Sequence, residues 1–140
     1  MSQQRPAVVA QLSVRRGREA VDFYRAAFGA VEVYRVGGTD DDPELVSQLQ
    51  IAGTTFWVAD ESPAHGNPSP ETVGGCTTRL LLVVDDPDAV VTQAVGAGAR
   101  EVQPVTEDYG WRLGRIEDPF GHHWEVGHPL GAWPPTSGPH

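Results

Sequence analysis

Arg79 and Glu125 are the residues of this chain whose types are best suited to chemistry. The strand pattern described below directs both side chains to one inner face, so we expect them to form an ion pair. That pair is either a structural salt bridge or a grip on a charged or polar group of a ligand. Loss of one partner of a buried pair typically costs about 3–5 kcal/mol, so substitution of either residue should weaken folding as well as binding.

Tryptophan side chains supply the second set of candidates. Trp57 is expected on the same inner face as the charged pair, and Trp111 lies at the rim of the second half of the chain. Aromatic rings that line a binding site stack planar or cationic ligands, each contact contributing roughly 0.5–2 kcal/mol. Simple core packing is the alternative for Trp57. Trp124 alternates with Glu125 along one strand and should therefore point into the core.

The other reactive side chains form no catalytic motif in the sequence. His122 and His123 point to opposite faces of one strand. Cys76 has no histidine close to it in sequence, so we expect an unreactive thiol. The glycine pairs of the chain lack the strand-to-helix context of a phosphate-binding loop.

A repeat in the sequence positions these residues. A strand-like run followed by a helical stretch occurs at 9–30 and again at 79–99, and the segment 53–58 corresponds to 121–126. Equivalent positions of two structural copies face each other across a pseudo-twofold axis, and repeats therefore fix the architecture. Four residues are expected at the centre: Val9, Trp57, Arg79 and Glu125.

Both halves predict the same order of elements: strand, helix, strand, strand, strand. Apolar residues recur at helical spacing between Gly17 and Phe28, and Gly29 is a natural helix stop. In the second half, Asp86 and Pro87 are typical of a helix start. The sequence therefore predicts an α+β fold built from two βαβββ modules. Strands are expected at 8–14, 31–36, 45–52, 54–59, 77–84, 99–105, 111–117 and 122–127.

A chain of 140 residues has the size of one domain. Each half alone would be marginally stable, so the two modules should share a core. We expect residues 1–140 to form a single domain that divides into four parts: a first module at about 8–60, a linker at 61–76, a second module at about 77–128 and a tail at 129–140.

Charge and composition narrow the possible partners. The net charge is −9 and the sequence pI is near 4.8; such a surface repels phosphate backbones, which argues against nucleic acid. The N-terminal residues lack the apolar segment of a secretion signal, and no apolar run approaches the roughly 20 residues that a membrane helix needs. With Cys76 as the single cysteine, no internal disulfide can form. We expect a cytoplasmic protein without a membrane partner.

Four motifs, in order, resemble the vicinal oxygen chelate superfamily, which includes glyoxalase I, extradiol dioxygenases and bleomycin- and fosfomycin-resistance proteins. The resemblance covers about residues 8–128. It implies one curved eight-stranded sheet around a cup, with helices on the outside. It also implies a homodimer, often with the cup completed across modules or chains. The motifs lie at 21–30, 84–89, 97–99 and 118–122.

The same resemblance locates the metal ligands of metal-using members: a His or Gln early in the first strand of each module and a Glu on each last strand. The matching residues here are Val9, Arg79, Trp57 and Glu125, so one ligand of the four is kept. Valine and tryptophan offer no metal-binding lone pair, and arginine repels a cation. We expect no metal or other cofactor at this position. The alternative is a shifted site made from Gln11, His123 and Glu125.

We therefore expect a metal-free protein that holds a small planar or cationic organic molecule, as the drug-sequestering resistance members do. The alternative is a lyase, isomerase or epimerase, with or without a divalent metal, in which Glu125 is the general base and Arg79 stabilises an oxyanion. A third hypothesis is a dimeric interaction module with a filled cup, since fold does not fix function. The expected ligand-binding residues are Val9, Gln11, Trp57, Arg79, Trp111 and Glu125.

Overall fold

The computed structural model describes residues 4–135 and confirms the two βαβββ modules. The first module contains β1 (Gln11–Val14), α1 (Gly17–Phe28), β2 (Val31–Val36), β3 (Val46–Ile51) and β4 (Thr54–Asp60). The second contains β5 (Arg79–Val83), α3 (Pro87–Gly96), β6 (Arg100–Asp108), β7 (Trp111–Glu117) and β8 (His123–Pro129). The expected start of α3 is confirmed, since Asp86 caps this helix by accepting a hydrogen bond from the backbone N–H of Ala89.

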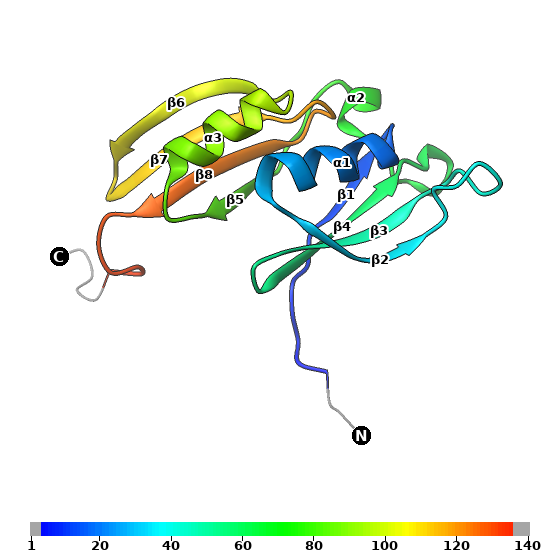
Figure 1. Cartoon of the computed structure of the whole chain (residues 1–140), viewed down its shortest axis with the longest axis horizontal. Coiled ribbons are helices and arrows are strands. Elements are labelled where there is room, and N and C mark those ends of the chain that lie inside the picture. Colours follow the sequence, from blue (N-terminus) through cyan, green and yellow to red (C-terminus); the bar gives the residue numbers. More distant parts are fainter. Residues whose placement is uncertain (1–3, 136–140) are drawn as a thin grey trace.

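Each module forms its own four-stranded mixed sheet, in the strand orders β1-β4-β3-β2 and β5-β8-β7-β6. β1 runs parallel to β4, and β5 runs parallel to β8. The eight expected strands are therefore present as two sheets that are not hydrogen-bonded to each other. Figure 1 shows α1 and α3 on the same side of these sheets. The opposite face of each sheet is consequently covered by neither helix.

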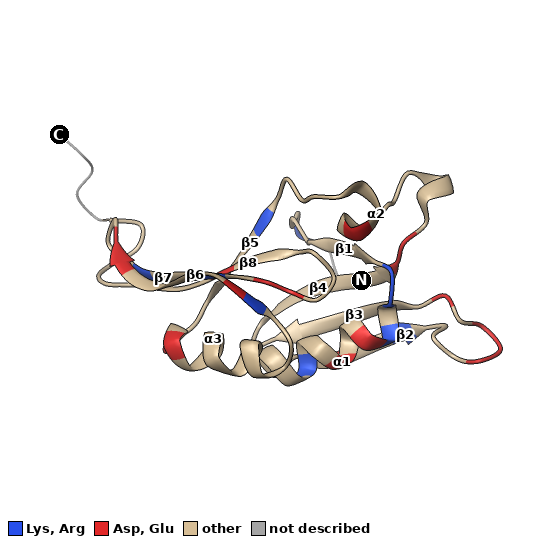
Figure 2. Cartoon of the chain, turned by 90° about the horizontal axis from the view of Figure 1, so that it is seen from above, with Lys and Arg blue, Asp and Glu red and all other residues tan. Residues whose placement is uncertain are grey.

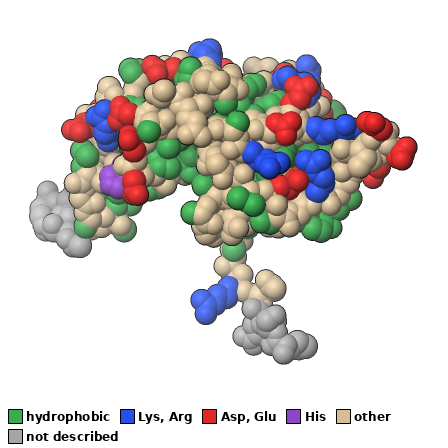
Figure 3. Space-filling model, in the orientation of Figure 1, with side chains coloured by type: hydrophobic (Ala, Val, Ile, Leu, Met, Phe, Trp, Pro, Cys, Tyr) green, Lys and Arg blue, Asp and Glu red, His purple; other side chains and the backbone are tan. Residues whose placement is uncertain are grey.

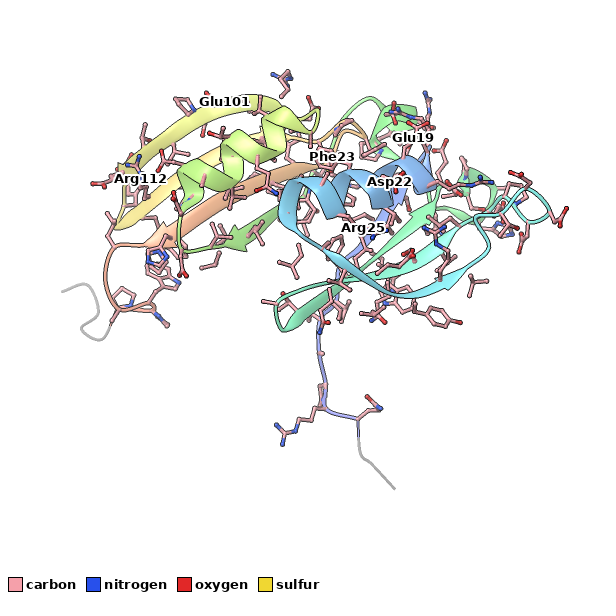
Figure 4. The ribbon with its side chains drawn as sticks, in the orientation of Figure 1. Glu19, Asp22, Phe23, Arg25, Glu101 and Arg112 are labelled. Carbon is pink, nitrogen blue, oxygen red and sulfur yellow. The ribbon has the colours of Figure 1, made fainter. Side chains whose placement is uncertain are left out.

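One hydrophobic core serves both modules, as expected from their size. Phe28 and Trp124 bring rings from the two modules to 4.8 Å between centroids, which confirms that Trp124 points into the core. Figure 4 shows charged side chains on the outward side of α1, whereas Phe23 lies on the side that faces the core. The buried side chains of α1 beyond Gly17 follow helical spacing: Ala20, Val21, Phe23, Tyr24 and Ala27.

The carboxylate of Asp118 is the buried polar centre that links the modules. The Tyr24 hydroxyl, from α1, donates a hydrogen bond to it, and the Trp124 indole N–H donates another at 3.0 Å. The backbone N–H groups of Phe120 and His122 donate to its second oxygen at 2.9 and 3.0 Å. Burial, together with the charge of Asp118, raises the pKa of Tyr24 well above its usual value, so the phenol remains a donor.

The segment between the modules, expected as an irregular linker, contains the 3₁₀ turn η1 (Pro63–His65) and the short helix α2 (Pro70–Val73). Ser69 caps α2 by accepting from the Thr72 N–H at 3.3 Å. The Glu61 carboxylate accepts from the Ser69 N–H and from the Thr72 hydroxyl, at 2.8 and 2.7 Å, and the hydroxyl lowers the pKa of Glu61. A capping serine followed by proline was the signal for this helix.

The chain after β8 folds back on the second module. The Leu130 N–H donates to the Gly110 carbonyl at 2.8 Å, and Trp133 contacts Trp111 edge-on at 5.2 Å between ring centroids. Residues 136–140 of the expected tail lie outside the described part of the chain. Within residues 4–135, no helix has the length and apolar character needed to cross a membrane.

Replacing Asp118 with alanine should destabilise the protein by about 3–5 kcal/mol, because it leaves buried donors of Tyr24 and Trp124 without an acceptor. Urea unfolding followed by circular dichroism measures this change. Asp40→Ala is the matched control, since Asp40 is exposed and contacts Arg18 at only 3.5 Å; it should change stability by less than about 1 kcal/mol. An equally small effect of Asp118→Ala would contradict the linking role of this carboxylate.

Candidate functional site

The uncovered face of the first sheet carries Trp57. Its neighbours along β4 are buried in the core, so the Trp57 ring points to the other side of the sheet. The strand register places Gln11 on one side of Trp57 and Gln48 on the other. Tyr34, opposite Gln48 on β2, makes an edge-on contact with Trp57 at 6.0 Å between centroids. We call Gln11, Tyr34, Gln48 and Trp57 the module 1 face; it is aromatic and amide-rich, and none of the four is charged.

A cavity of about 360 Å³ opens beside Trp57 and Gln11. Its volume falls within the range of small-molecule sites, roughly 300–1,000 Å³. Asp60 also borders this cavity, but its carboxylate accepts from the backbone N–H groups of Gly17 and Leu45, each at 2.7 Å. Asp60 therefore serves to hold the start of α1, and the ring and amides of the cavity are the groups left for a ligand.

The uncovered face of the second sheet carries the predicted ion pair. Arg79 Nε donates to Glu125 Oε1 at 2.8 Å, which confirms that the two side chains face each other. The Arg79 side chain is 53% exposed and the Glu125 side chain 24%, so the ion pair is more exposed to solvent than the sequence indicated. An exposed pair contributes about 0–1 kcal/mol to stability. The expected folding cost of breaking a buried pair is thus wrong for this site.

Arg115 extends the charged face and was missed by the sequence analysis. It lies on β7 directly opposite Glu125, and its Nε is buried without a hydrogen-bond partner among the described residues. Glu117, two residues along the same strand, accepts from Arg100 at 2.7 Å and lies 3.5 Å from His123 Nε2. His123 Nδ1 is likewise buried and unpartnered in the described chain. This face therefore offers hydrogen-bonding capacity that the protein itself does not use.

We call Arg79, Glu125, Arg115, Glu117 and His123 the module 2 face. Basic and acidic segments both occur along β6–β8 in Figure 2. Strand alternation was the signal that could have found Arg115, because it is separated from Glu117 by one residue and so shares its side of β7. Alternation alone does not predict that β7 pairs with β8, and this pairing is what places Arg115 beside Glu125.

The predicted residues lie in two groups. Gln11 is beside Trp57, and Arg79 is beside Glu125. Between residues 4 and 135, no hydrogen bond, ion pair or aromatic contact joins one group to the other. Val9 lies before the start of β1 and is 39% exposed. The contacts of one chain therefore do not bring the four expected central residues together.

Trp111 is placed differently from the expected rim position. It is buried rather than open, and Trp133 from the tail covers it edge-on. A Cβ added at Gly127 would lie 3.2 Å from the Trp111 ring, so the ring packs directly against the backbone of β8. This packing leaves Trp57 as the tryptophan that borders a cavity on an uncovered face.

The donor set at the centre does not fit the metal site that the resemblance implies. Val9 and Trp57 supply no ligand atom, and the carboxylate of Glu125 already accepts from the guanidinium of Arg79. The alternative set is divided, since Gln11 belongs to the module 1 face whereas His123 and Glu125 belong to the module 2 face. Among residues 4–135, no three side chains of His, Cys, Asp or Glu are arranged to hold a metal ion.

The sequence matches the family model of the Glyoxalase/Bleomycin resistance protein/Dioxygenase superfamily over residues 7–126. The uncharacterized protein Rv0887c of Mycobacterium tuberculosis is 38% identical over 130 residues, a stretch that covers 89% of this chain and 75% of that protein. The match therefore extends over both modules.

Solved structures share the fold. The crystal structure of the At5g48480 product of Arabidopsis thaliana superposes with a TM-score of 0.66 at 32% identity, covering 89% of this chain and 98% of that one. The fosfomycin resistance protein FosX from Mesorhizobium loti superposes with a TM-score of 0.64 at 15% identity, covering 94% and 95% of the two chains. The second likeness is one of fold alone.

Glu125→Gln should lower the free energy of unfolding by less than about 1 kcal/mol, because the Arg79 pair is substantially exposed. Urea unfolding at neutral pH measures the change, and Arg79→Gln should give a similar value. A loss of about 3 kcal/mol or more would show instead that the pair is dry in solution.

Proposed function

Since the chain belongs to the Glyoxalase/Bleomycin resistance protein/Dioxygenase superfamily, we propose that it binds a small planar organic molecule without a metal, in the manner of the drug-sequestering members. One observation carries the proposal: the two uncovered faces are chemically complementary. The module 1 face offers rings and amides, and the module 2 face offers unused donors. Sequestration requires such contacts and no nucleophile.

The aromatic part of the site selects a flat ligand. Trp57 borders a cavity of about 360 Å³. Tyr34, on β2, contacts the Trp57 ring edge-on and so restricts its orientation. A further ring that stacks there would gain about 0.5–1.5 kcal/mol beyond the area it buries. Gln11 and Gln48 flank the ring and can bond to heteroatoms at the edge of the ligand.

The charged part of the site selects a hydrogen-bond acceptor. Arg79 and Arg100 are engaged with Glu125 and Glu117, whereas the buried Nε of Arg115 has no partner among the described residues. A ligand carbonyl or carboxylate on this face would meet the terminal nitrogens of the Arg115 guanidinium and accept a charge-assisted hydrogen bond from them. We therefore favour an acceptor-bearing ligand over the cationic one that the net charge suggested.

The lyase alternative has less support in this geometry. In that mechanism Glu125 takes a proton from the substrate while Arg79 separately stabilises the oxyanion. Here Arg79 Nε donates to Glu125 Oε1 at 2.8 Å, so the two side chains act on each other. The pair is thus better suited to orient a bound molecule than to abstract a proton from it.

A second copy of the chain is the partner that we propose to complete the site. Apolar side chains on the uncovered faces remain half-exposed, and Val8 is fully exposed in the N-terminal segment that projects from the body in Figures 1 and 3. A twofold interface is self-complementary, so it would set the module 1 face of one chain against the module 2 face of its partner, twice. The half-exposed residues include Val31, Leu81 and Val83.

Sedimentation equilibrium should therefore give the mass of a dimer at micromolar concentration. Leu81→Glu places a charge on the exposed face of β5 and should shift the protein to monomer. Val95→Glu, on the outward side of α3, is the matched control and should remain dimeric. A wild-type protein that is monomeric at every concentration would contradict the proposed partner.

Titration calorimetry with 2-naphthoate tests the ligand proposal. 2-Naphthylmethylamine serves as the comparison compound, because it has the same ring system but a positive charge in place of the carboxylate. The carboxylate should bind more tightly, and Trp57→Leu should weaken it by about tenfold through the lost ring contact. Arg115→Gln should weaken it by about tenfold or more through the lost charge-assisted bond. Arg112→Gln is the control, because Arg112 lies on the other side of β7 and pairs with Asp88 at the start of α3. Figure 4 labels Arg112 at the end of the second module.

Two results would contradict the ligand proposal. One is tighter binding of the amine than of the carboxylate, which would mean that the carboxylates and not Arg115 select the ligand. The other is binding that Trp57→Leu and Arg115→Gln leave unchanged, which would place the ligand elsewhere.

A further inference from the structure

A second cavity, of about 370 Å³, lies between β1 and the segment that leads into β5. It adjoins the module 1 face, since Gln11, Leu12 and Ser13 border both cavities, but neither Trp57 nor Glu125 borders it. Its walls contain apolar side chains, hydroxyls and one amide, with no Arg, Asp or Glu. The described residues around it are Ala10–Ser13, Pro68, Pro70, Val73, Gly75–Thr78, Leu80 and His122.

Cys76 and His122 meet at this cavity although 46 positions separate them in the sequence. The Cys76 Sγ lies 4.0 Å from His122 Nδ1, and the thiol is exposed, so a reagent can reach it. The expectation that Cys76 has no histidine neighbour therefore holds along the sequence but not in space.

The hydrogen bonds of His122 define which ring nitrogen is available. His122 Nε2 lies 2.9 Å from the Ser13 carbonyl oxygen, which can only accept, so Nε2 carries the hydrogen. The neutral imidazole then has its lone pair on Nδ1, and Cys76 Sγ is the one partner of Nδ1 among the described residues. The His122 side chain is only 9% exposed, so this lone pair is directed at the thiol and away from bulk water.

The ring is also held in place by its backbone. The His122 N–H donates to Asp118 Oδ1 at 3.0 Å, and Gly121 before it has a positive φ of 92°. A Cβ at Gly121 would come within 2.7 Å of Pro70, so glycine is required for the turn to pack on α2. The turn therefore fixes the position of the His122 ring. The exposed Cys76 thiol, whose Sγ lies 3.2 Å from the Thr78 carbonyl oxygen, can rotate from that carbonyl towards His122 Nδ1.

We propose that Cys76 and His122 form a nucleophile–base pair that adds covalently to small uncharged α,β-unsaturated carbonyl compounds bound in this cavity. His122 Nδ1 takes the thiol proton, and the sulfur electron pair forms a C–S bond to the β-carbon. The carbon–carbon π electrons move to the enolate oxygen, which the hydroxyls of Thr77 and Thr78 can stabilise. The imidazolium then returns its proton to the α-carbon, so the addition consumes no other reagent.

The lining of the cavity argues for an uncharged electrophile. A charged thiol reagent would enter a site with no opposite charge to compensate its desolvation. The acidic chain as a whole, with net charge −9, also disfavours anions. A neutral enone instead buries its carbon skeleton against Leu12, Val73 and Leu80.

Alkylation by N-ethylmaleimide, followed by intact-protein mass spectrometry, tests the pair in the full chain. Because Cys76 is the single cysteine, the urea-unfolded chain supplies the reference rate for the same thiol. The folded protein should react at least about tenfold faster than the unfolded chain, as general-base assistance allows. His122→Gln keeps an N–H donor for Ser13 but removes the base, and it should slow the folded protein by about tenfold or more.

His65→Gln is the matched control and should leave the rate unchanged, because His65 lies in η1 and does not border this cavity. A second measurement does not depend on any variant: maleimidopropionate shares the reacting ring of N-ethylmaleimide but carries a carboxylate. Folding should lower its rate relative to that of N-ethylmaleimide. The proposal is overturned if folded Cys76 reacts no faster than in urea, if a folded His122→Gln protein reacts like the wild type, or if folding leaves the ratio of the two reagents unchanged.

Discussion

The buried carboxylate of Asp118 holds the two modules of the protein together. It collects donors from α1 of the first module and from β8 of the second, so two marginal half-domains share one core. The bonds from Tyr24 and Trp124 lie on the helix side of both sheets. The helices are therefore committed to that side, and the opposite faces are left free to interact with other molecules. The same carboxylate also fixes the turn that carries His122.

Equivalent positions on the uncovered faces of the two modules carry side chains of different chemical types. Trp57 and Glu125 occupy corresponding places in the two modules, yet one contributes a ring and the other a carboxylate held by Arg79. A metal ion would need donors at both places, and the guanidinium supplies a positive charge beside the one carboxylate present. An ion pair and an unused Arg115 donor therefore stand where the superfamily resemblance implies metal ligands.

Local patterns in the sequence were sufficient for the eight strands and for α1 and α3, whereas η1 and α2 were not expected. Together with the repeat, they also placed the contact between β5 and β8. The apolar spacing that ends at Gly29 gave α1, and alternation placed Arg79 opposite Glu125. Arg115 was missed because its role depends on which strand lies beside β8, a long-range pairing that no local pattern encodes. The approach of Cys76 to His122 is likewise a tertiary contact. Trp111 is covered by Trp133, which is 22 residues later in the sequence. The residues around Trp111 in its own strand therefore did not predict that it is buried.

Native mass spectrometry of the untagged protein measures directly whether these two faces hold a metal ion. Incubation with zinc, nickel, manganese and ferrous iron, each followed by desalting, covers the divalent ions that nitrogen and oxygen ligands hold. We expect binding far below one equivalent for every ion, because Val9, Trp57 and Arg79 cannot act as ligands. A stoichiometric metal that Glu125→Gln removes would show that these faces hold a metal after all, and a metal-dependent enzyme would then explain them better.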